Sequence, residues 1–290
     1  MRVEEIRRYP IKSMLGESLA GTEVTAQGLA GDRARAVLDV ATGKVASAKH
    51  PRLWRDLLGL HGTQEHDDAC LSAVLGREVR LIATPPENAE LEKADPEEVL
   101  AREADLESRP EMRLAREGGP ERGLAREGGS ERGPARAGGS TEGPAREADD
   151  VTVRVGRLGG AAPGTFFDFA PVHLITTSTL TALGGMEAVR YRPNLVIGGA
   201  AEGFPENGWV GREVGVGAEV VLEVIVVSPR CVVPTLAHGD LPKDREALRR
   251  PAERNRVPVF DLGELPCAGA YAKVLRPGTI RTGDPVTLLT

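Results

Sequence analysis

The chain has 290 residues and a net charge of −6, and two fifths of it is apolar, which is enough for a real core in one large domain or two modest ones. Its three cysteines lack zinc-finger or ferredoxin spacing, which argues against a disulfide scaffold and against an iron–sulfur cluster held by this chain. The first residues lack the apolar stretch of a signal peptide, and no run approaches the roughly 20 apolar residues of a membrane helix. Basic residues are dispersed and aromatics are few, so we expect a cytoplasmic protein with no membrane and no nucleic-acid partner.

Short strands separated by turn signals are expected in the first part of the chain. The apolar and β-branched runs predict strands at Val3–Ile11, Glu23–Ala26, Ala34–Val40 and Arg77–Ala83. A glycine in Asp39–Lys44 predicts a hairpin turn, and Pro85-Pro86 ends the last strand. We assign residues 1–86 to a first, β-rich domain.

Residues 87–150 differ in kind from the rest of the chain. They carry 18 acids and 10 bases, so the negative charge of the chain belongs to them and the remainder is near neutral. A ten-residue unit that begins at Leu114 recurs at Leu124 and, in degenerate form, at Pro134. Each unit holds at most one large apolar residue and two or three glycines, too little apolar surface to offset the entropy of ordering. We predict a low-complexity, largely disordered acidic insert, with residues 101–149 as its disordered part.

Residues 151–290 are predicted to form a second β-rich domain. Strands are expected at Val151–Val155, Ala170–Thr176, Leu195–Ile197, Glu213–Val216, Glu219–Val227 and Ala272–Leu275, and Gly278–Leu289 closes the chain with Gly283-Asp284 as its turn. A short helix is expected over Thr177–Met186, capped by Thr177 or Ser178, and one or two helical turns within Leu241–Arg249. The pattern favours a mainly β fold with short helices, in the α+β class, built of barrel-like sheets.

Cys231 lies where a long apolar strand stops. Pro229 ends the strand because proline cannot donate to a sheet ladder. A cysteine that follows a rigid strand and lies next to Arg230 is held in place and biased toward the thiolate, which is what a soft metal ligand or a nucleophile requires. The alternative is a small cysteine packed in the core, a common role for free cysteine.

Six motifs in sequential order carry a resemblance to a known family. They are Tyr9–Ser13, Gly28–Arg33, Phe169–Ser178, Tyr191–Ile197, Pro229–Thr235 and Pro277–Val286. In this order the motifs resemble the MOSC family with its N-terminal MOSC β-barrel domain, the group that holds the amidoxime-reducing components and the C-terminal domains of molybdenum-cofactor sulfurases. The resemblance covers nearly all of the chain outside the insert, and it implies an N-terminal β-barrel domain followed by a barrel-like MOSC domain.

The resemblance implies a molybdenum cofactor, in which a pterin dithiolene holds the metal and bears a phosphate tail. In the reductase branch the equivalent of Cys231 is the protein thiolate on molybdenum, so the resemblance makes Cys231 both metal ligand and catalytic residue. The other residues that it implies for cofactor binding are Lys12, Ser13, Arg33, Thr177, Ser178, Arg192, Asn194 and Arg230. Lysine and arginine suit a phosphate, whereas hydroxyls and an amide suit the polar edge of a pterin. Each also has a structural interpretation: Lys12 as a solvated lysine, Arg33 as a partner of Asp32, and Thr177 or Ser178 as a helix cap.

The segment after Arg230-Cys231 departs from the family pattern. Reductases usually continue into an acidic Asp-Pro-x-Thr-Gly stretch, whereas this chain reads Leu236–Pro242. We expect Asp240 to replace that acid as a catalytic residue and His238 either to enter the site or to lie at the surface. Of the other cysteines, Cys70 is expected to be structural, and Cys267 to be structural or to support the site from behind.

The sequence therefore favours a molybdenum-dependent oxidoreductase that reduces small N-hydroxylated compounds with electrons from a separate donor protein, because no ferredoxin domain follows Thr290. Two alternatives remain open. One is a cofactor carrier or sulfur-transfer protein that uses a persulfide on Cys231. The other is a non-catalytic protein that binds the cofactor or another anion.

Overall fold

Most of the chain outside the acidic insert is described by the computed structural model, which covers residues 1–96, 98, 101, 153–157, 162 and 164–289. Met1–Pro96 and Thr152–Thr290 belong to one compact unit. Most of the predicted low-complexity insert, residues 87–150, lies outside the described residues, and so does nearly all of its predicted disordered part, residues 101–149. Within the insert, Glu90–Ala94 form a strand. The division of the chain at residues 86 and 151 remains a prediction.

The described residues are mainly β with short helices, as the sequence predicts. The main sheet is built from β1 (Arg2–Arg8), β2 (Glu17–Leu19), β9 (Val172–Thr176), β10 (Leu195–Gly198), β11 (Glu213–Val216), β12 (Val220–Pro229), β13 (Arg256–Pro258), β14 (Glu264–Arg276) and β16 (Val286–Leu288). Its strands follow the order β16-β11-β12-β14-β9-β10-β1-β2, and β13 pairs with β14. Smaller sheets are made by β15 (Gly278–Arg281), β3 (Gly21–Thr25) and β4 (Gly28–Leu29), by β5 (Ala36–Asp39) and β6 (Val79–Ile82), and by β7 (Glu90–Ala94) and β8 (Val153–Arg157).

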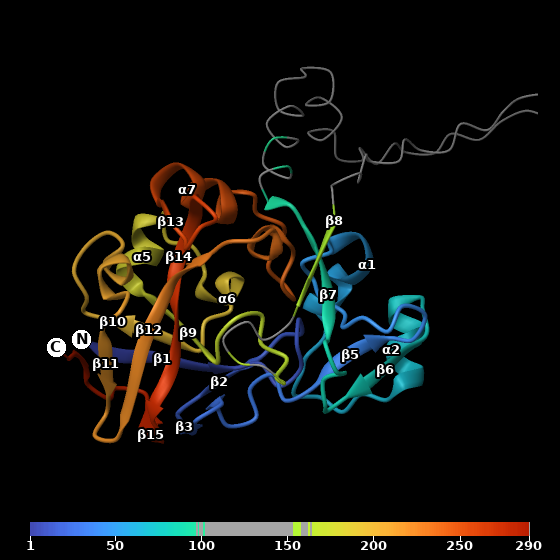
Figure 1. Cartoon of the computed structure of the whole chain (residues 1–290), viewed down its shortest axis with the longest axis horizontal. Coiled ribbons are helices and arrows are strands. Elements are labelled where there is room, and N and C mark those ends of the chain that lie inside the picture. Colours follow the sequence, from blue (N-terminus) through green and yellow to red (C-terminus); the bar gives the residue numbers. More distant parts are fainter. Residues whose placement is uncertain (97, 99–100, 102–152, 158–161, 163, 290) are drawn as a thin grey trace, which may run out of the picture. The chain divides into compact units, whose positions relative to one another are not determined.

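The helices are short and lie around these sheets (Figure 1). They are α1 (Pro51–Trp54), α2 (Asp68–Leu75), α5 (Thr177–Ala182), α6 (Ala188–Tyr191) and α7 (Glu246–Arg254), with the 3₁₀ segments η1 (Arg55–Gly59), η2 (Pro205–Trp209) and η3 (Val233–Thr235).

Strands from both predicted domains share sheets. β1 pairs antiparallel with β10, and β3 pairs antiparallel with β15. A common core lies behind this pairing, in which Ile6 of β1 packs with Leu195 of β10 and Leu222 of β12. A second core fills the N-terminal part, around Trp54 and Val79. Because backbone ladders and apolar contacts cross from one part to the other, residues of both can meet in one site.

Several boundaries differ from those that the sequence predicts. β14 begins at Glu264, whereas only Ala272–Leu275 was expected, because the buried residues from Cys267 to Ala270 are small and lack β-branching. Helix α5 ends at Ala182 because Gly184 and Gly185 both take positive φ. Its N-cap is Thr176, whose side chain accepts the Thr179 amide; the prediction that Thr177 or Ser178 caps it is wrong.

One further expectation is confirmed and one is corrected. A helical turn within Leu241–Arg249 is confirmed, because α7 begins at Glu246, and the helix continues beyond Arg249 to Arg254. The prediction that Cys70 is a buried structural cysteine is wrong: it is exposed on α2, which buries only Leu71. A short helix with one anchoring residue leaves its other positions in solvent.

The ends of the acidic insert lie side by side. β7 and β8 pair antiparallel, with Ala94 opposite Val153, so the chain leaves and re-enters the fold at the same place. Deleting residues 101–149 should therefore leave a short loop across this strand pair, and the melting temperature should stay nearly unchanged. Thermal denaturation of the deletion variant checks this, and a loss of many degrees would show that the segment stabilises the fold.

Candidate functional site

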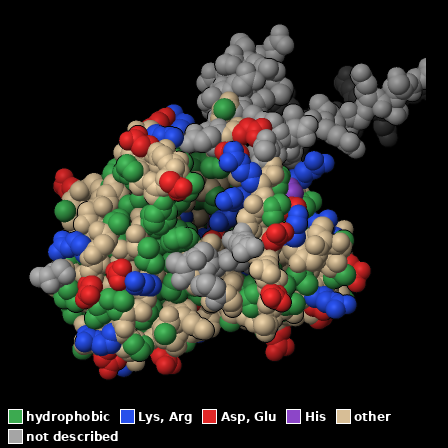
Figure 2. Space-filling model, in the orientation of Figure 1, with side chains coloured by type: hydrophobic (Ala, Val, Ile, Leu, Met, Phe, Trp, Pro, Cys, Tyr) green, Lys and Arg blue, Asp and Glu red, His purple; other side chains and the backbone are tan. Residues whose placement is uncertain are grey.

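A cavity that is partly open to solvent lies where residues from the N-terminal and C-terminal parts of the chain meet. Figure 2 shows a hollow in this face of the molecule with Lys and Arg side chains gathered at its edge. Among the described residues, the lining has one carboxylate, Asp168, against the cations Lys12, Arg33, Lys49, Arg190, Arg192 and Arg230. This imbalance of charge favours an anionic occupant.

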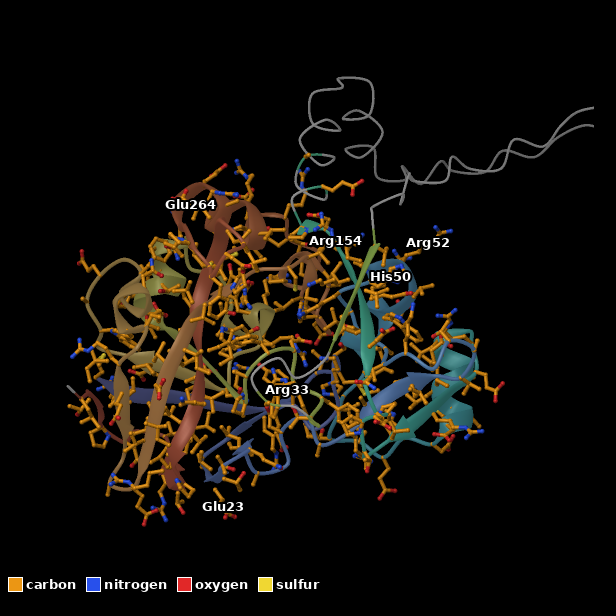
Figure 3. All side chains as sticks on the ribbon, viewed as in Figure 1. Glu23, Arg33, His50, Arg52, Arg154 and Glu264 are labelled. Atoms are coloured by element: carbon orange, nitrogen blue, oxygen red, sulfur yellow. The ribbon has the colours of Figure 1, made fainter. Side chains whose placement is uncertain are left out.

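The cavity brings together seven of the ten residues that the sequence singles out. They are Lys12, Ser13, Arg33, Arg192, Asn194, Arg230 and Cys231. Figure 3 shows Arg33, from the N-terminal part, in the interior of the molecule among the elements that form this site. Thr177, Ser178 and Asp240 do not line the cavity.

Cys231 is positioned by the end of β12. Pro229 pairs with Cys267 of β14, and the Arg230 amide donates to the Pro266 carbonyl at 2.8 Å, so the backbone is fixed up to the residue before the cysteine. Cys231 itself is partly exposed, lines the cavity and is a free thiol. Its sulfur is therefore both held in place and accessible, as a metal ligand or nucleophile requires.

Arg192 is the lining residue best suited to an anionic ligand. It follows α6 in the left-handed conformation, with φ +56°, and its guanidinium lies 4.3 Å from the centre of the Tyr9 ring. Among the described residues its Nη1 and Nη2 are buried and have no hydrogen-bond partner. Burial lowers the pKa of Arg192 to about 10, although the nearby Tyr9 hydroxyl opposes this. A buried unpaired cation is costly, so an anion that met it would be bound strongly.

Arg33 belongs to an internal network as well as to the cavity. It forms an ion pair with Asp32, which is fully buried, and its Nη2 donates to the Arg192 carbonyl at 3.2 Å. Asn194 completes the network, because its Nδ2 donates to Asp32 at 2.9 Å and its Oδ1 accepts the His173 amide at 3.0 Å. The ion pair expected for Arg33 in its structural role is present, and the network holds the backbone of Arg192 in place.

Two lysines share one carboxylate in the cavity. Lys12 forms an ion pair with Asp168 and donates to the Phe166 carbonyl at 3.0 Å, while Lys49 lies 3.1 Å from the other oxygen of Asp168. Burial lowers the pKa of Lys12 to about 8, against the opposing charge of Asp168. Burial alone would raise the pKa of Asp168, but the two ammonium groups overcome it and hold that pKa well below its usual range. Lys12 is thus buried, and its interpretation as a solvated lysine is wrong.

Arg230 and His173 line the cavity beside this cluster. Arg230 donates to the Ser228 hydroxyl at 2.6 Å and to the Tyr191 carbonyl at 3.4 Å, but its Nε is buried without a partner in the described structure. Burial, reinforced by the charge of Arg230, lowers the pKa of His173 well below its ordinary value. His173 is therefore neutral at physiological pH and leaves the positive charge to the arginines and lysines.

The remaining predicted residues have other contacts. The Ser178 hydroxyl donates to the Ala200 carbonyl at 3.1 Å, and Asp240 is exposed beyond η3. Ser13 lines the cavity with φ +64°, but its hydroxyl accepts the Ala48 amide at 3.1 Å. Cys267 is buried within β14, where burial raises the pKa of its thiol to about 12. A thiol in such a position stays protonated and contributes packing.

His238 is buried, so its interpretation as a surface residue is wrong. One ring nitrogen, Nδ1, lies 2.9 Å from the Leu236 carbonyl, and Nε2 is buried without a partner among the described residues. Burial lowers its pKa to about 4, with help from the charges of Arg192 and Arg190. It does not line the cavity.

Acid should destabilise the protein through His238. The folded-state pKa of His238 lies below the ordinary value of about 6.5. The contribution of its neutral ring to the free energy of unfolding is therefore intact above pH 6.5 and is lost as the pH falls toward 4. The free energy of unfolding of the wild type should fall between pH 7.5 and 4.5. His238→Asn keeps a donor near the Nδ1 position, and this fall should be smaller in the variant by on the order of 2 kcal/mol. Urea unfolding at both pH values measures this, with the exposed His61→Asn as control. Identical pH dependence in His238→Asn and wild type would contradict the assignment.

Several lining residues escaped the sequence analysis, among them Lys49, Asp168 and Tyr271. Asp168 carried a usable signal, since an isolated acid between Phe166-Phe167 and Phe169 is expected to be buried and paired. Lys49 and Tyr271 lie in segments without any such pattern.

No group of three or more His, Cys, Asp and Glu side chains that could hold a metal ion occurs within the described ranges. In the same part of the chain, no helix is long and apolar enough to cross a membrane.

Two family models match the chain. The model of the MOSC N-terminal beta barrel domain matches residues 1–81, and the model of the MOSC domain matches residues 165–287. Cys231 and Arg192 lie in the second match, and Lys12 and Arg33 lie in the first.

Among curated proteins, the chain is 31% identical over 135 residues to mitochondrial amidoxime-reducing component 1 of Mus musculus, covering 43% of this chain and 38% of that protein. It is 29% identical over 128 residues to mitochondrial amidoxime reducing component 2 of Rattus norvegicus, covering 41% and 37%. The match thus spans about two fifths of the length of these relatives.

Two solved structures are distantly similar. The YUAD protein from Bacillus subtilis aligns over 98% of this chain and 93% of its own, with a TM-score of 0.42 and 10% identity. YiiM from Geobacillus stearothermophilus aligns over 42% and 55%, with a TM-score of 0.30 and 16% identity.

Proposed function

The chain is a MOSC-domain protein with a MOSC N-terminal β-barrel domain, and on this premise we propose that it is a molybdenum-cofactor-dependent oxidoreductase that reduces small N-hydroxylated compounds. The observation that carries the proposal is the guanidinium of Arg192, buried and unpartnered in a cationic cavity that also contains the Cys231 thiol. The names of the curated relatives support the type of reaction.

The residues present fit such a cofactor. Its phosphate would meet the unpartnered Nη1 and Nη2 of Arg192 and the free Nε of Arg230, which have no other partner in the described structure. Lys12 would add the positive charge of its ammonium group, which the ion pair with Asp168 already neutralises in part. The Cys231 thiolate would hold the metal, since soft sulfur ligands suit a metal that already bears sulfur.

When bound, the molybdenum cofactor supplies the electron pair at a metal centre able to accept oxygen. Two electrons and two protons convert an N–OH group into N–H and release one water molecule. Arg192 and Arg230 would hold the anionic end of the cofactor, and the strand end fixes the backbone that would present Cys231 to the metal. Protons reach the cavity from solvent, because the cavity is open on one side. Electrons come from a separate donor protein, and a cytoplasmic location remains part of the proposal.

Metal content and product formation test the proposal together. Protein from a host that makes the cofactor should contain about one molybdenum per chain, and protein from a cofactor-deficient host should contain none. With reduced methyl viologen as electron source, the loaded protein should convert benzamidoxime to benzamidine and hydroxylaminopurine to aminopurine. Loaded protein that forms neither product would contradict the reductase.

A sulfur-transfer role is the second candidate, and the partial exposure of the free Cys231 thiol favours it. A persulfide there would be stabilised as an anion by the surrounding cations. Mass spectrometry after incubation with a cysteine desulfurase and cysteine distinguishes the two: a gain of one sulfur on Cys231 together with no reduction of benzamidoxime identifies a carrier. Bound molybdenum with neither property would leave a cofactor-binding protein.

A further inference from the structure

An aromatic ladder leads outward from the cavity. Tyr271, in the cavity wall, lies 5.2 Å from His173 and 5.7 Å from Phe169, measured between ring centres. Phe169 lies 5.9 Å from Phe260 in turn. These spacings and tilts are those of favourable aromatic pairs. The inner rings are anchored, because Phe169 and Tyr271 pack against the apolar cluster under β13 and β14.

The outermost ring has features that packing does not explain. Phe260 is 62% exposed, and its φ of +48° is in the left-handed region, which is strained for a residue other than glycine. The turn that holds it is closed by the Val259 amide donating to the Gly263 carbonyl at 3.0 Å. A large ring held rigidly in solvent at a strained position gains little from folding, so a role in binding is the better account.

The chemistry of the lining indicates what would bind there. Most of the cavity wall is charged or hydrogen-bonding and suits an anionic cofactor, whereas the ladder offers flat apolar faces. An aromatic face prefers another flat ring, stacked or edge-on. A substrate whose N-hydroxyl reaches toward Cys231 would leave its remaining part beside these rings.

We propose that Phe260, together with Phe169 and Tyr271, forms an outer subsite that selects substrates carrying a flat aromatic or heteroaromatic group next to the N-hydroxyl. This inference rests on the proposed reductase function and adds to it the substrate class and the residue that sets the preference.

The outer subsite is tested by comparing two amidoximes as substrates of the cofactor-loaded enzyme. With reduced methyl viologen as donor, KM is measured for benzamidoxime, which is aromatic, and acetamidoxime, which is not. Phe260→Ser should raise the KM for benzamidoxime about three- to tenfold and leave that for acetamidoxime unchanged, with kcat little altered. Leu262→Ser is the matched control, because Leu262 is 65% exposed on the same turn without a ring. Phe260→Trp should retain the preference.

The binding of benzamidoxime, measured without turnover, tests the outer subsite independently. In the oxidised enzyme, saturation transfer from protein to the benzamidoxime ring protons should be strong in wild type and Leu262→Ser and weak in Phe260→Ser. Reduction of both amidoximes by all variants with an unchanged KM ratio would overturn the subsite and leave the reductase intact; failure of the wild type to reduce either would instead refute the reductase. Loss of turnover with a reduced flavoprotein donor, but not with methyl viologen, in both Phe260→Ser and Leu262→Ser would make the turn a donor-docking surface and refute the subsite.

Discussion

Cys231→Ser should leave the protein folded and abolish reduction of N-hydroxylated compounds. The backbone at this position is set by the ladder between β12 and β14, which does not depend on the sulfur, so the melting temperature should not change. A serine hydroxyl is a hard ligand that stays protonated at neutral pH and cannot replace a thiolate on a soft metal. Benzamidine formation, measured with equal amounts of wild type and variant, should fall by at least two orders of magnitude.

Cys267→Ser is the matched control for this variant. Cys267 is fully buried within β14 and does not line the cavity, so its replacement should cost stability and leave the activity per folded molecule unchanged. Full activity in Cys231→Ser, or loss of activity per folded molecule in Cys267→Ser, would show that the wrong thiol has been assigned.

Arg192→Met should weaken cofactor binding without weakening the fold. In the cofactor-free protein the buried guanidinium is unpaired and its pKa is lowered to about 10, so below that pH the charged form destabilises the folded state. Methionine loses the cation–π contact with the Tyr9 ring, but its thioether can pack on that ring and the charge penalty is removed, so the free energy of unfolding should stay equal or rise. A lost charge-assisted contact should lower the affinity for the cofactor roughly ten- to a hundredfold. Molybdenum content under limiting cofactor and urea unfolding measure the two effects.

Arg33→Met should behave differently and serves as the comparison. Arg33 is paired with the fully buried Asp32, and removal of one member of a buried pair costs roughly 3–5 kcal/mol. It should therefore lose stability and occupancy together. If Arg192→Met loses stability as Arg33→Met does, its guanidinium contributes to the fold and is not reserved for an anion.

Local pattern was enough to predict the position of Cys231. A β-branched run followed by Ser228-Pro229 can only be a buried strand that stops, and β12 does end at Pro229. Short apolar runs between turn residues likewise predicted that most elements would be strands. The full length of β14 was not, because alanine, cysteine and glycine in its buried part resemble no strand pattern.

The composition of the cavity depends on tertiary contacts that no local pattern contains. Lys49, in the loop before α1, forms an ion pair with Asp168 only because the N-terminal and C-terminal parts of the chain pack together. The resemblance implied Thr177 and Ser178 as cofactor-binding residues. Neither lines the cavity, and the Ser178 hydroxyl donates to the Ala200 carbonyl. The pairing of Arg33 with its neighbour Asp32 was predicted from the sequence, but the complete burial of the Asp32 side chain was not.

The most direct test of the central claim is the number of sulfur neighbours around molybdenum, measured by X-ray absorption at the metal edge. Wild type loaded in a cofactor-competent host should show about one molybdenum per chain with three sulfur neighbours, two from the pterin dithiolene and one from Cys231. Cys231→Ser should keep the metal and lose one of them. A protein without molybdenum, or an unchanged sulfur count in the variant, would contradict the assignment of this cavity to the cofactor and of Cys231 to its metal.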